Sequence, residues 1–260
     1  MVLVTGASKG IGRAAALAFA FAKEGDDLAI CARGRELIEE TGALLAKMGA
    51  RVVTGAVVIS KQDQVEAFVA RVAESLGRID VLVNNAASST AATFFQSTNE
   101  DWQKQFDVSV LGMVNCCRAV IPHMQKQRWG RIVNLSTRQA IKPSVPMYIR
   151  YSAIKASVGN LSKTLATALA KDGILVNCIS PGFIETPIHT DPHALLDQMA
   201  AAVGKTREEL VEGAASKIPL GRLGTPEEVA AAILFFSSDK ASYITGANLI
   251  IDGGAREGWA

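Results

Sequence analysis

Short apolar runs recur along the chain, separated by longer stretches in which apolar residues have helical spacing. Several runs are apolar throughout rather than alternating, which is typical of strands covered on both faces. The expected strands are Val2–Val4, Leu28–Cys31, Arg51–Ile59, Ile79–Val83, Arg131–Leu135, Ile174–Ile179 and Asn248–Ile251. The expected helical stretches are 12–44 (which contains the strand Leu28–Cys31), 61–76, 99–127, 151–171 and 226–237. This alternation predicts an α/β fold: one domain built on a doubly wound, parallel, seven-stranded sheet with helices on both faces.

Two local signals stand out in the last third of the chain. The segment Thr186–Ser216 breaks the alternation with nearby prolines and two short helical patterns. We expect it to leave the sheet, and excursions of this length are usually functional. After it, Thr225 is a good N-cap, Pro226 suits the first helical position, and Glu228 stands three residues after the cap. This order predicts a helix start with a capping box.

Composition excludes several classes of protein. The chain has 260 residues, of which 49% are hydrophobic and 20% charged, too apolar for a disordered chain. Its 27 basic and 25 acidic residues leave a net charge of +2, so we expect no nucleic-acid partner. The longest uncharged apolar run, Ala14–Ala22, is far shorter than the ~18–20 residues of a membrane span. We therefore expect no membrane association.

The start of the sequence and its cysteines indicate the compartment. The chain begins directly with an expected strand, and no basic and apolar secretory signal is visible. The four cysteines do not match a compact disulfide framework, and we expect four buried thiols in a reducing cytoplasm: Cys31, Cys116, Cys117 and Cys178.

A glycine-rich loop, Thr5–Gly12, follows the first expected strand and opens a helix. Glycines at such a turn let the backbone approach a pyrophosphate, and the helix N-terminus offers unpaired N–H groups and a positive dipole end. An ordinary glycine turn is the alternative interpretation. The candidate phosphate contacts in the loop are Gly6, Ser8, Lys9, Gly10, Ile11 and Gly12.

The residue that ends the second expected strand selects between two nicotinamide cofactors. An acid there would bind a ribose 2′-hydroxyl, whereas an arginine accommodates a 2′-phosphate. Here the strand ends in Cys31-Ala32-Arg33, and Lys9 adds a second cation on the same side. The pair favours NADP(H) over NAD(H), although either cation alone could be a solvated surface residue.

Tyr151 and Lys155 are spaced by four residues, which places both side chains on one helix face. A nearby ammonium favours the phenolate, so the spacing predicts a tyrosine pKa lowered from ~10 towards neutrality. Such a tyrosine can exchange a proton with a substrate oxygen. A surface pair is the alternative, but neither of the other two tyrosines has a lysine four residues later.

These pieces, in this order, resemble the short-chain dehydrogenase/reductase family over essentially the whole chain. Each motif is modest, but the ordered set is highly specific. Beyond the TGxxxGxG-like loop and the YxxxK-like pair, the matching segments are Asn84–Ala87, Gly130–Thr137, Asn177–Thr186, Ile244–Gly246 and Asp252–Gly254.

The resemblance implies a Rossmann fold and a mechanism. A nicotinamide cofactor would exchange hydride with a carbonyl or carbinol carbon. Tyr151 would be the general acid in reduction and the general base in oxidation. Lys155 would bind the nicotinamide ribose and lower the tyrosine pKa. A hydroxyl near the end of strand 5 would hold the substrate oxygen, and residues 186–216 would form a substrate lid.

The resemblance also assigns the remaining cofactor contacts. Asn85 and Ala86 would lie on the adenosine side. Ile184 and Thr186 would meet the carboxamide. Both lie in the family-like segment Asn177–Thr186. The last two expected cofactor contacts, Pro181 and Gly182, lie in the same segment.

Several residues depart from the family pattern. The strand-5 serine aligns with Thr137, which keeps the hydroxyl and adds a methyl group; Ser136 remains an alternative. The fourth catalytic residue of the family, an asparagine, aligns with Ser109, which could still order a water. Val58 stands where an acid usually meets adenine, and Ala87 replaces a glycine. The first helix also looks two residues longer than usual.

The leading functional hypothesis is an NADP(H)-dependent oxidoreductase that acts on a small ketone or secondary alcohol. Within the family, the chain most resembles the 3-oxoacyl-(acyl-carrier-protein) reductases, and Arg128 and Arg131 are candidates for a basic carrier-docking patch. The alternative is a cofactor-binding protein with little turnover that acts as a sensor or scaffold. The resemblance also implies a homotetramer or homodimer.

No metal site is expected. His189 and His193 flank Asp191, but Pro192 spoils a helical pair, and no further ligand stands close in sequence.

Overall fold

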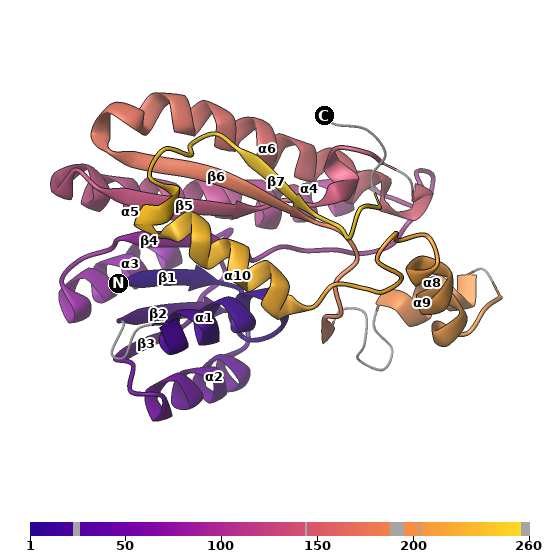
Figure 1. Cartoon of the computed structure of the whole chain (residues 1–260), viewed down its shortest axis with the longest axis horizontal. Coiled ribbons are helices and arrows are strands. Elements are labelled where there is room, and N and C mark those ends of the chain that lie inside the picture. The colour runs from indigo at the N-terminus through magenta and orange to yellow at the C-terminus, as the bar shows by residue number, and fades with distance from the viewer. Residues whose placement is uncertain (23–26, 144, 188–194, 203, 256–260) are drawn as a thin grey trace.

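A computed structural model of the chain describes residues 1–22, 27–143, 145–187, 195–202 and 204–255. Its centre is a seven-stranded sheet in the order β3-β2-β1-β4-β5-β6-β7 (Figure 1), and every neighbouring pair is parallel. The predicted fold class and all seven expected strands are confirmed. The strands are β1 Val2–Thr5, β2 Leu28–Ala32, β3 Val52–Ala56, β4 Val81–Asn84, β5 Gly130–Leu135, β6 Ile174–Pro181 and β7 Asn248–Ile251.

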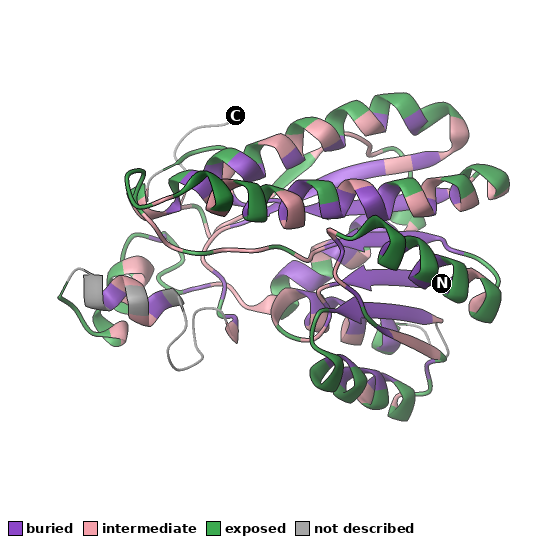
Figure 2. Ribbon diagram, turned by 180° about the vertical axis from the view of Figure 1, so that it is seen from behind, coloured by how far each residue is buried: buried purple, intermediate pink, exposed green. Residues whose placement is uncertain are grey.

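The central strands are buried on both sides, as their uninterrupted apolar runs predict. Successive side chains of a strand point to opposite faces. Val4 and Ile30 accordingly belong to one apolar core, which includes residues of the helices Gly10–Ala22, Arg35–Lys47 and Pro226–Ser237. Leu3 and Ala29 belong to the other core, which includes residues of the helices Gln62–Leu76, Gly112–Gln127 and Ile149–Leu169. Figure 2 shows these buried strands between helices whose outer faces are exposed.

The helices lie close to their expected positions, with two differences. The stretch 12–44 holds two helices on either side of β2, and the stretch 99–127 is interrupted by a π-helical turn at Asp107–Leu111. The helices are α1 Gly10–Ala22, α2 Arg35–Lys47, α3 Gln62–Leu76, α4 Asn99–Phe106, α5 Gly112–Gln127, α6 Ile149–Leu169, α8 Leu195–Ala202, α9 Arg207–Ala215 and α10 Pro226–Ser237.

The predicted start of α10 is confirmed in detail. The Thr225 side chain accepts a hydrogen bond from the backbone of Glu228, and the Glu228 carboxylate accepts one from the backbone of Thr225, with Pro226 at the first position. Such a box satisfies two N–H groups that the helix cannot pair internally.

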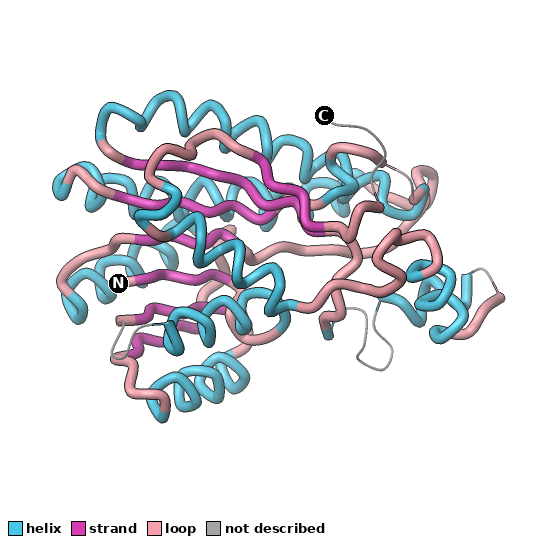
Figure 3. Tube along the Cα trace, viewed as in Figure 1, coloured by secondary structure: helices cyan, strands magenta, loops and turns pink. Residues whose placement is uncertain are grey.

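The excursion after β6 also forms. Figures 1 and 3 show α8 and α9 beyond the carboxyl ends of the strands, apart from the layers of the sheet. All four cysteines are buried and unbridged, as expected. Among the helices of the described residues, none is both long and apolar enough to cross a bilayer.

Candidate active site

The loops that follow β1, β4, β5 and β6 meet at the carboxyl edge of the sheet. In open parallel sheets, ligands bind at this edge where the strand order reverses. The reversal lies between β1 and β4. The edge therefore brings together the glycine loop, the segment after Asn84, the hydroxyls after Leu135 and the run that begins at Pro181.

The glycine loop needs its glycines for two reasons. Gly6 (φ 67°) and Gly10 (φ 59°) have left-handed backbone conformations, which glycine adopts without strain. Gly12 is needed for packing, because a Cβ atom there would lie 2.4 Å from both the Gly6 carbonyl oxygen and Asn85 Nδ2. The Asn85 amide donates to the carbonyls of Thr5 (3.0 Å) and Gly6 (3.1 Å). Asn85, which directly follows the neighbouring strand β4, thus holds the loop in place through these two hydrogen bonds.

A cavity of about 650 Å³ opens in front of this loop and the first turn of α1. Its size is within the range of ~300–1,000 Å³ that is usual for cofactor sites. The first turn of α1 adds N–H donors and a positive dipole end for an anion. The cradle therefore fits a cofactor with a pyrophosphate. The sequence-predicted residues that line it are Gly6, Ser8, Lys9, Gly10, Ile11, Arg33, Asn85, Ala86 and Thr186.

Other predicted cofactor contacts have different surroundings. Gly12 lies beneath the loop. Ile184 is buried and forms a β-bridge with Gly224. Pro181 pairs with Ile251 of β7, whereas Gly182 lines a second, smaller cavity. The cofactor contacts of these four residues stay predictions.

The cavity wall near the end of β2 carries the predicted selector. Arg33 is exposed and lines the cavity, as does Lys9, and no aspartate or glutamate is among the described lining residues. Val58, which stands where the family usually has an acid, also lines this cavity. The wall therefore suits an additional phosphate better than a bare ribose hydroxyl.

Tyr151 and Thr137 both line the smaller cavity, of about 110 Å³, and Thr137 is close enough to lower the pKa of Tyr151 in part. Thr137 comes from the end of β5 and Tyr151 from the first turns of α6. Ser136 is placed differently: its hydroxyl is buried and donates 2.9 Å to the backbone carbonyl of Lys155. Of the two candidate hydroxyls, the structure brings only Thr137 to Tyr151. The cavity is also lined by Ser89, Arg138, Gln139, Tyr148, Gly182 and Phe183.

The expected effect of Lys155 on Tyr151 is wrong for the chain without cofactor. Burial raises the pKa of Tyr151 to about 12, and the nearby Thr137 side chain offsets only part of this. Burial also lowers the pKa of Lys155 to about 8. The Lys155 ammonium donates 2.5 Å to the Leu135 carbonyl. A spacing of four residues does not reveal how strongly each side chain is desolvated, and desolvation dominates the pKa of both groups.

Ser109 lies in the π-helical turn, buried against the segment that follows β4. Its hydroxyl accepts a long hydrogen bond, 3.5 Å, from the backbone N–H of Ser88. π-turns insert one residue into a helix and are frequent at functional sites. The structure thus shows Ser109 supporting the loop beside Ser89, and its catalytic role stays a prediction.

Comparisons with known proteins identify the family. The family model described as enoyl-(acyl carrier protein) reductase matches residues 6–256. The chain belongs to the short-chain dehydrogenase/reductase family. It is 40% identical to a 3-oxoacyl-(acyl-carrier-protein) reductase of Thermotoga maritima, covering 97% of this chain and 96% of the relative. It is 38% identical to 3beta-hydroxysteroid dehydrogenase 1 of Eggerthella lenta, covering 97% and 92%.

A solved structure agrees with these relatives. L-sorbose reductase from Gluconobacter frateurii, complexed with NADPH and L-sorbose, superposes with a TM-score of 0.89 at 33% identity, covering 98% of this chain and 95% of that one. As a short-chain dehydrogenase/reductase, the chain is an oxidoreductase. The enzyme interpretation of the sequence is therefore confirmed in preference to the binding-protein interpretation.

Sequence reasoning missed Arg150, which precedes the tyrosine of this short-chain dehydrogenase/reductase. Its side chain is buried; Nε donates to Gln105 Oε1 at 2.5 Å, and Nη2 donates to the Thr90 hydroxyl. Nη1 lies 3.6 Å from the Asp101 carboxylate. These contacts tie the start of α6 to α4 and to the loop after β4. The only signal in the sequence is a charged residue within an otherwise apolar helix start.

The proposed carrier-docking role of Arg131 is not supported by its position. Arg131 is buried at the amino end of β5, where its guanidinium stacks on Trp129, 4.2 Å from the ring centre. This end of the sheet is opposite to the end that carries Tyr151. A buried, stacked guanidinium cannot form part of an exposed docking patch.

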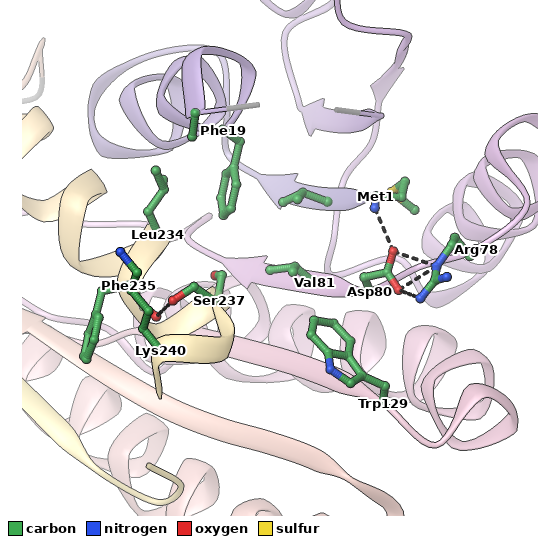
Figure 4. A pocket seen from close by; sticks show the side chains of 13 residues that line it. Met1, Phe19, Arg78, Asp80, Val81, Trp129, Leu234, Phe235, Ser237 and Lys240 are labelled. Atoms are coloured by element: carbon green, nitrogen blue, oxygen red, sulfur yellow. Dashed lines mark hydrogen bonds and ion pairs between the residues drawn. The ribbon is translucent and has the colours of Figure 1, made fainter. Parts of the chain in front are cut away.

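Trp129 also lines a cavity of about 800 Å³ at that amino end, shown in Figure 4. Its walls are largely apolar, with Phe19 and Leu234 among them. Its buried carboxylate, Asp80, is held by the Met1 amino group (2.7 Å) and by Arg78. This pairing accounts for the carboxylate without a ligand, so the carboxyl edge remains the candidate active site.

Within the described residues, no group of three or more histidine, cysteine, aspartate or glutamate side chains could hold a metal ion. His189 and His193, considered above, lie outside the described residues.

Proposed function

We propose that this enzyme reduces a ketone with NADPH, or oxidises the corresponding secondary alcohol with NADP⁺. The observation that carries the proposal is that the Tyr151 and Thr137 side chains line one small cavity together. The small cavity and the larger cavity in front of the glycine loop are connected by one segment of chain, residues 182–186. Gly182 lines the small cavity and Thr186 lines the larger one. The NADPH in the related L-sorbose reductase supports the same cofactor.

The side chains divide the work of reduction between them. When bound, the nicotinamide cofactor supplies the hydride that the carbonyl carbon accepts. Tyr151 donates its phenolic proton to the carbonyl oxygen, and a pKa of about 12 keeps that proton available at neutral pH. The Thr137 hydroxyl donates a hydrogen bond to the same oxygen as negative charge develops. A proton from solvent then restores Tyr151, and the product is the alcohol.

Lys155 has a separate part in this mechanism. Its buried ammonium, fixed by the Leu135 carbonyl, places a positive charge on the Tyr151 face of α6. We expect this charge to bind the ribose hydroxyls of the cofactor and to stabilise the tyrosinate that remains after proton donation.

Equilibrium binding of the two cofactors tests the proposal. Fluorescence titration of the purified protein should show micromolar affinity for NADPH and at least tenfold weaker affinity for NADH. Arg33→Ser should narrow this difference about tenfold, because a guanidinium–phosphate contact is lost. Arg35→Ser is a matched control, since Arg35 pairs with Glu39 and is not among the described residues that line the cavity. Equal affinity of the wild-type protein for both cofactors would overturn the NADP(H) preference.

We also propose that the enzyme self-associates through the β7 edge of the sheet. β7 ends the sheet, so its outer backbone groups face no neighbouring strand within the part of the chain that the structure describes. Leu249 on this strand and the nearby Tyr243 are exposed. Size-exclusion chromatography with light scattering should show a dimer or tetramer, and Leu249→Lys should weaken it. A monomeric wild-type protein would contradict this.

A further inference from the structure

The small cavity adjoins a wider one that reaches towards α9. The wider cavity has a volume of about 610 Å³ and shares four lining residues with the small one: Arg138, Gln139, Tyr148 and Phe183. Residues of α8 and α9 form much of its outer wall. A substrate with its carbonyl at Tyr151 can therefore extend past Arg138 into this second space.

The wider cavity combines an apolar wall with a marked excess of positive charge. Among the residues that the structure describes, its charged lining residues are Arg138, Lys142, Lys205 and Lys217, against the single carboxylate of Glu209. The whole chain is nearly balanced, with 27 basic and 25 acidic residues, so a four-to-one ratio is a local concentration. Apolar residues complete the wall: Val145, Leu196, Met199, Leu210 and Ile218.

Two described carboxylates lie near these cations, those of Glu209 and Asp252. Glu209 accepts from the Thr206 backbone at 2.8 Å in the capping box of α9. Behind Arg138, Asp252 approaches only to 4.0 Å, and its other oxygen accepts from the Gly254 backbone. A guanidinium has five donors, so this loose pairing leaves Arg138 able to bind a second anion.

Arg138 also has the position that such a contact requires. It directly follows Thr137, and it lines both cavities. Its side chain is 20% exposed, so its charge is only partly screened by solvent. An anionic group in the wider cavity would complement the partly buried Arg138 and the exposed Lys205 and Lys217, an attraction that a neutral substrate does not gain.

We propose that the physiological substrate is an anionic ketone, with a carboxylate or phosphate separated from the carbonyl by an apolar segment. This inference rests on the proposed function and names its substrate class. The carbonyl lies at Tyr151 and Thr137, the apolar segment passes Tyr148 and Phe183, and the anionic group lies near Arg138 and the lysines of the wider cavity.

Matched pairs of acid and ester test this proposal. Suitable probes are 4-oxopentanoate, 5-oxohexanoate and 7-oxooctanoate, each beside its methyl ester, with NADPH at low ionic strength. We expect kcat/KM to be at least tenfold higher for the best acid than for its ester, and the ratio to fall as salt is added. The preferred chain length reports the distance between carbonyl and anion. A phosphate-terminated ketone and its neutral alcohol form a parallel pair that distinguishes phosphate from carboxylate.

Variants locate the effect. Replacing Lys205 and Lys217 together with methionine should lower the acid-to-ester ratio several-fold, with part of the preference kept because Arg138 remains. Lys104→Met, an exposed lysine on α4, should leave the ratio unchanged. Calorimetric titration with the corresponding hydroxy acid and its ester gives the same comparison without turnover, and the acid should bind at least tenfold more tightly.

The outcomes separate this inference from the proposed function. Equal kcat/KM for acid and ester, or a ratio that the double lysine variant does not change, would overturn the anionic substrate while NADPH-dependent ketone reduction stands. If NADPH does not bind and no ketone, neutral or anionic, is reduced, both proposals fail together.

Discussion

Ser136 and Thr137 are adjacent at the end of β5, yet their hydroxyls face different partners. The Ser136 hydroxyl donates 2.9 Å to the backbone carbonyl of Lys155, whereas the Thr137 hydroxyl accepts from the backbone of Gln139 at 3.3 Å and Thr137 lines the small cavity with Tyr151. The Ser136 contact fixes β5 against α6, and it leaves Thr137 as the hydroxyl residue beside Tyr151. Thr137 is therefore the hydroxyl we expect to contact the substrate oxygen.

Replacing the two hydroxyls separately should have different effects. Thr137→Val keeps the shape of the side chain but removes its donor, and should lower kcat about 100-fold, as losses of similar oxyanion donors do. Thr137→Ser should stay within a few fold of wild type. Ser136→Ala should lower the free energy of unfolding by about 1 kcal/mol, with a smaller loss of kcat. Steady-state kinetics and urea denaturation measure both, and a kcat loss in Ser136→Ala equal to that of Thr137→Val would contradict the assignment.

The low pKa of Lys155 predicts how reduction depends on pH. Burial lowers this pKa to about 8, so the ammonium is present below pH 8 and is lost above it. Tyr151, with a pKa of about 12, keeps its proton throughout this range. We therefore expect kcat/KM for reduction to fall above about pH 8. A profile that stays flat to pH 10 would show that the charge on Lys155 is not needed.

The contribution of Lys155 to stability should rise over the pH range in which kcat/KM falls. A loss of activity caused by deprotonation of Lys155 can therefore be distinguished from a loss caused by unfolding. Because the pKa of Lys155 is about 8 in the folded chain and 10.5 as its ordinary value, the unfolded chain binds more protons between these two pH values. The contribution of Lys155 to the free energy of unfolding therefore rises with pH across that interval. Urea denaturation of wild type and Lys155→Met at pH 7 and 10 should show the free energy of unfolding of wild type, relative to that of the variant, rise with pH.

The sheet was predictable from sequence because each buried strand is a compact apolar run. The break in the 99–127 helix was not, because a π-turn adds one residue to a helix and barely changes its apolar spacing. The position of Thr137 was anticipated by resemblance, but choosing it over Ser136 needed the contact between Ser136 and Lys155. Arg138 and Arg150 were missed because their importance depends on partners distant in sequence.

The pKa of Tyr151 is a second property that could not be predicted from the sequence. A spacing of four residues places two side chains on one face, but it carries no information on how deeply that face is buried. Desolvation depends on β5 and on the loops that cover α6, which only the folded chain supplies. The shift is therefore opposite to the one expected from the nearby lysine alone.

The packing of the glycine loop makes Gly12→Ala a sharp test of the cofactor cavity. A Cβ atom would lie 2.4 Å from both the Gly6 carbonyl oxygen and Asn85 Nδ2, so the loop must move. We expect NADPH affinity to fall at least tenfold and the free energy of unfolding to fall by about 1–3 kcal/mol. Gly213→Ala on α9 is the control: its Cβ meets no atom within 4 Å, and alanine favours a helix interior. Unchanged NADPH affinity in Gly12→Ala would show that the loop does not hold the cofactor.

The buried Arg150 network should control the geometry of the loop beside Tyr151. Arg150→Met removes the donors to Gln105 and Thr90 and leaves the buried Gln105 acceptor without its partner, whereas the exposed Thr90 hydroxyl can bond to water. The free energy of unfolding should therefore fall by about 1–3 kcal/mol, and kcat should fall with it, because the loop that carries Ser89 loses its link to α6. Arg150→Lys should restore little, since an ammonium cannot reproduce the fork of a guanidinium.

A double-mutant cycle shows which partner matters. Asp101 is partly exposed and 3.6 Å from the guanidinium, so its coupling to Arg150 should be below about 1 kcal/mol. Gln105 is buried and directly bonded, and in turn donates 2.9 Å to the Ser88 carbonyl, so its coupling should be larger. Urea denaturation of the two cycles, Arg150→Met with Asp101→Asn and with Gln105→Leu, gives both values. A larger coupling to Asp101 would mean that charge, rather than the buried hydrogen bonds, holds this loop in place.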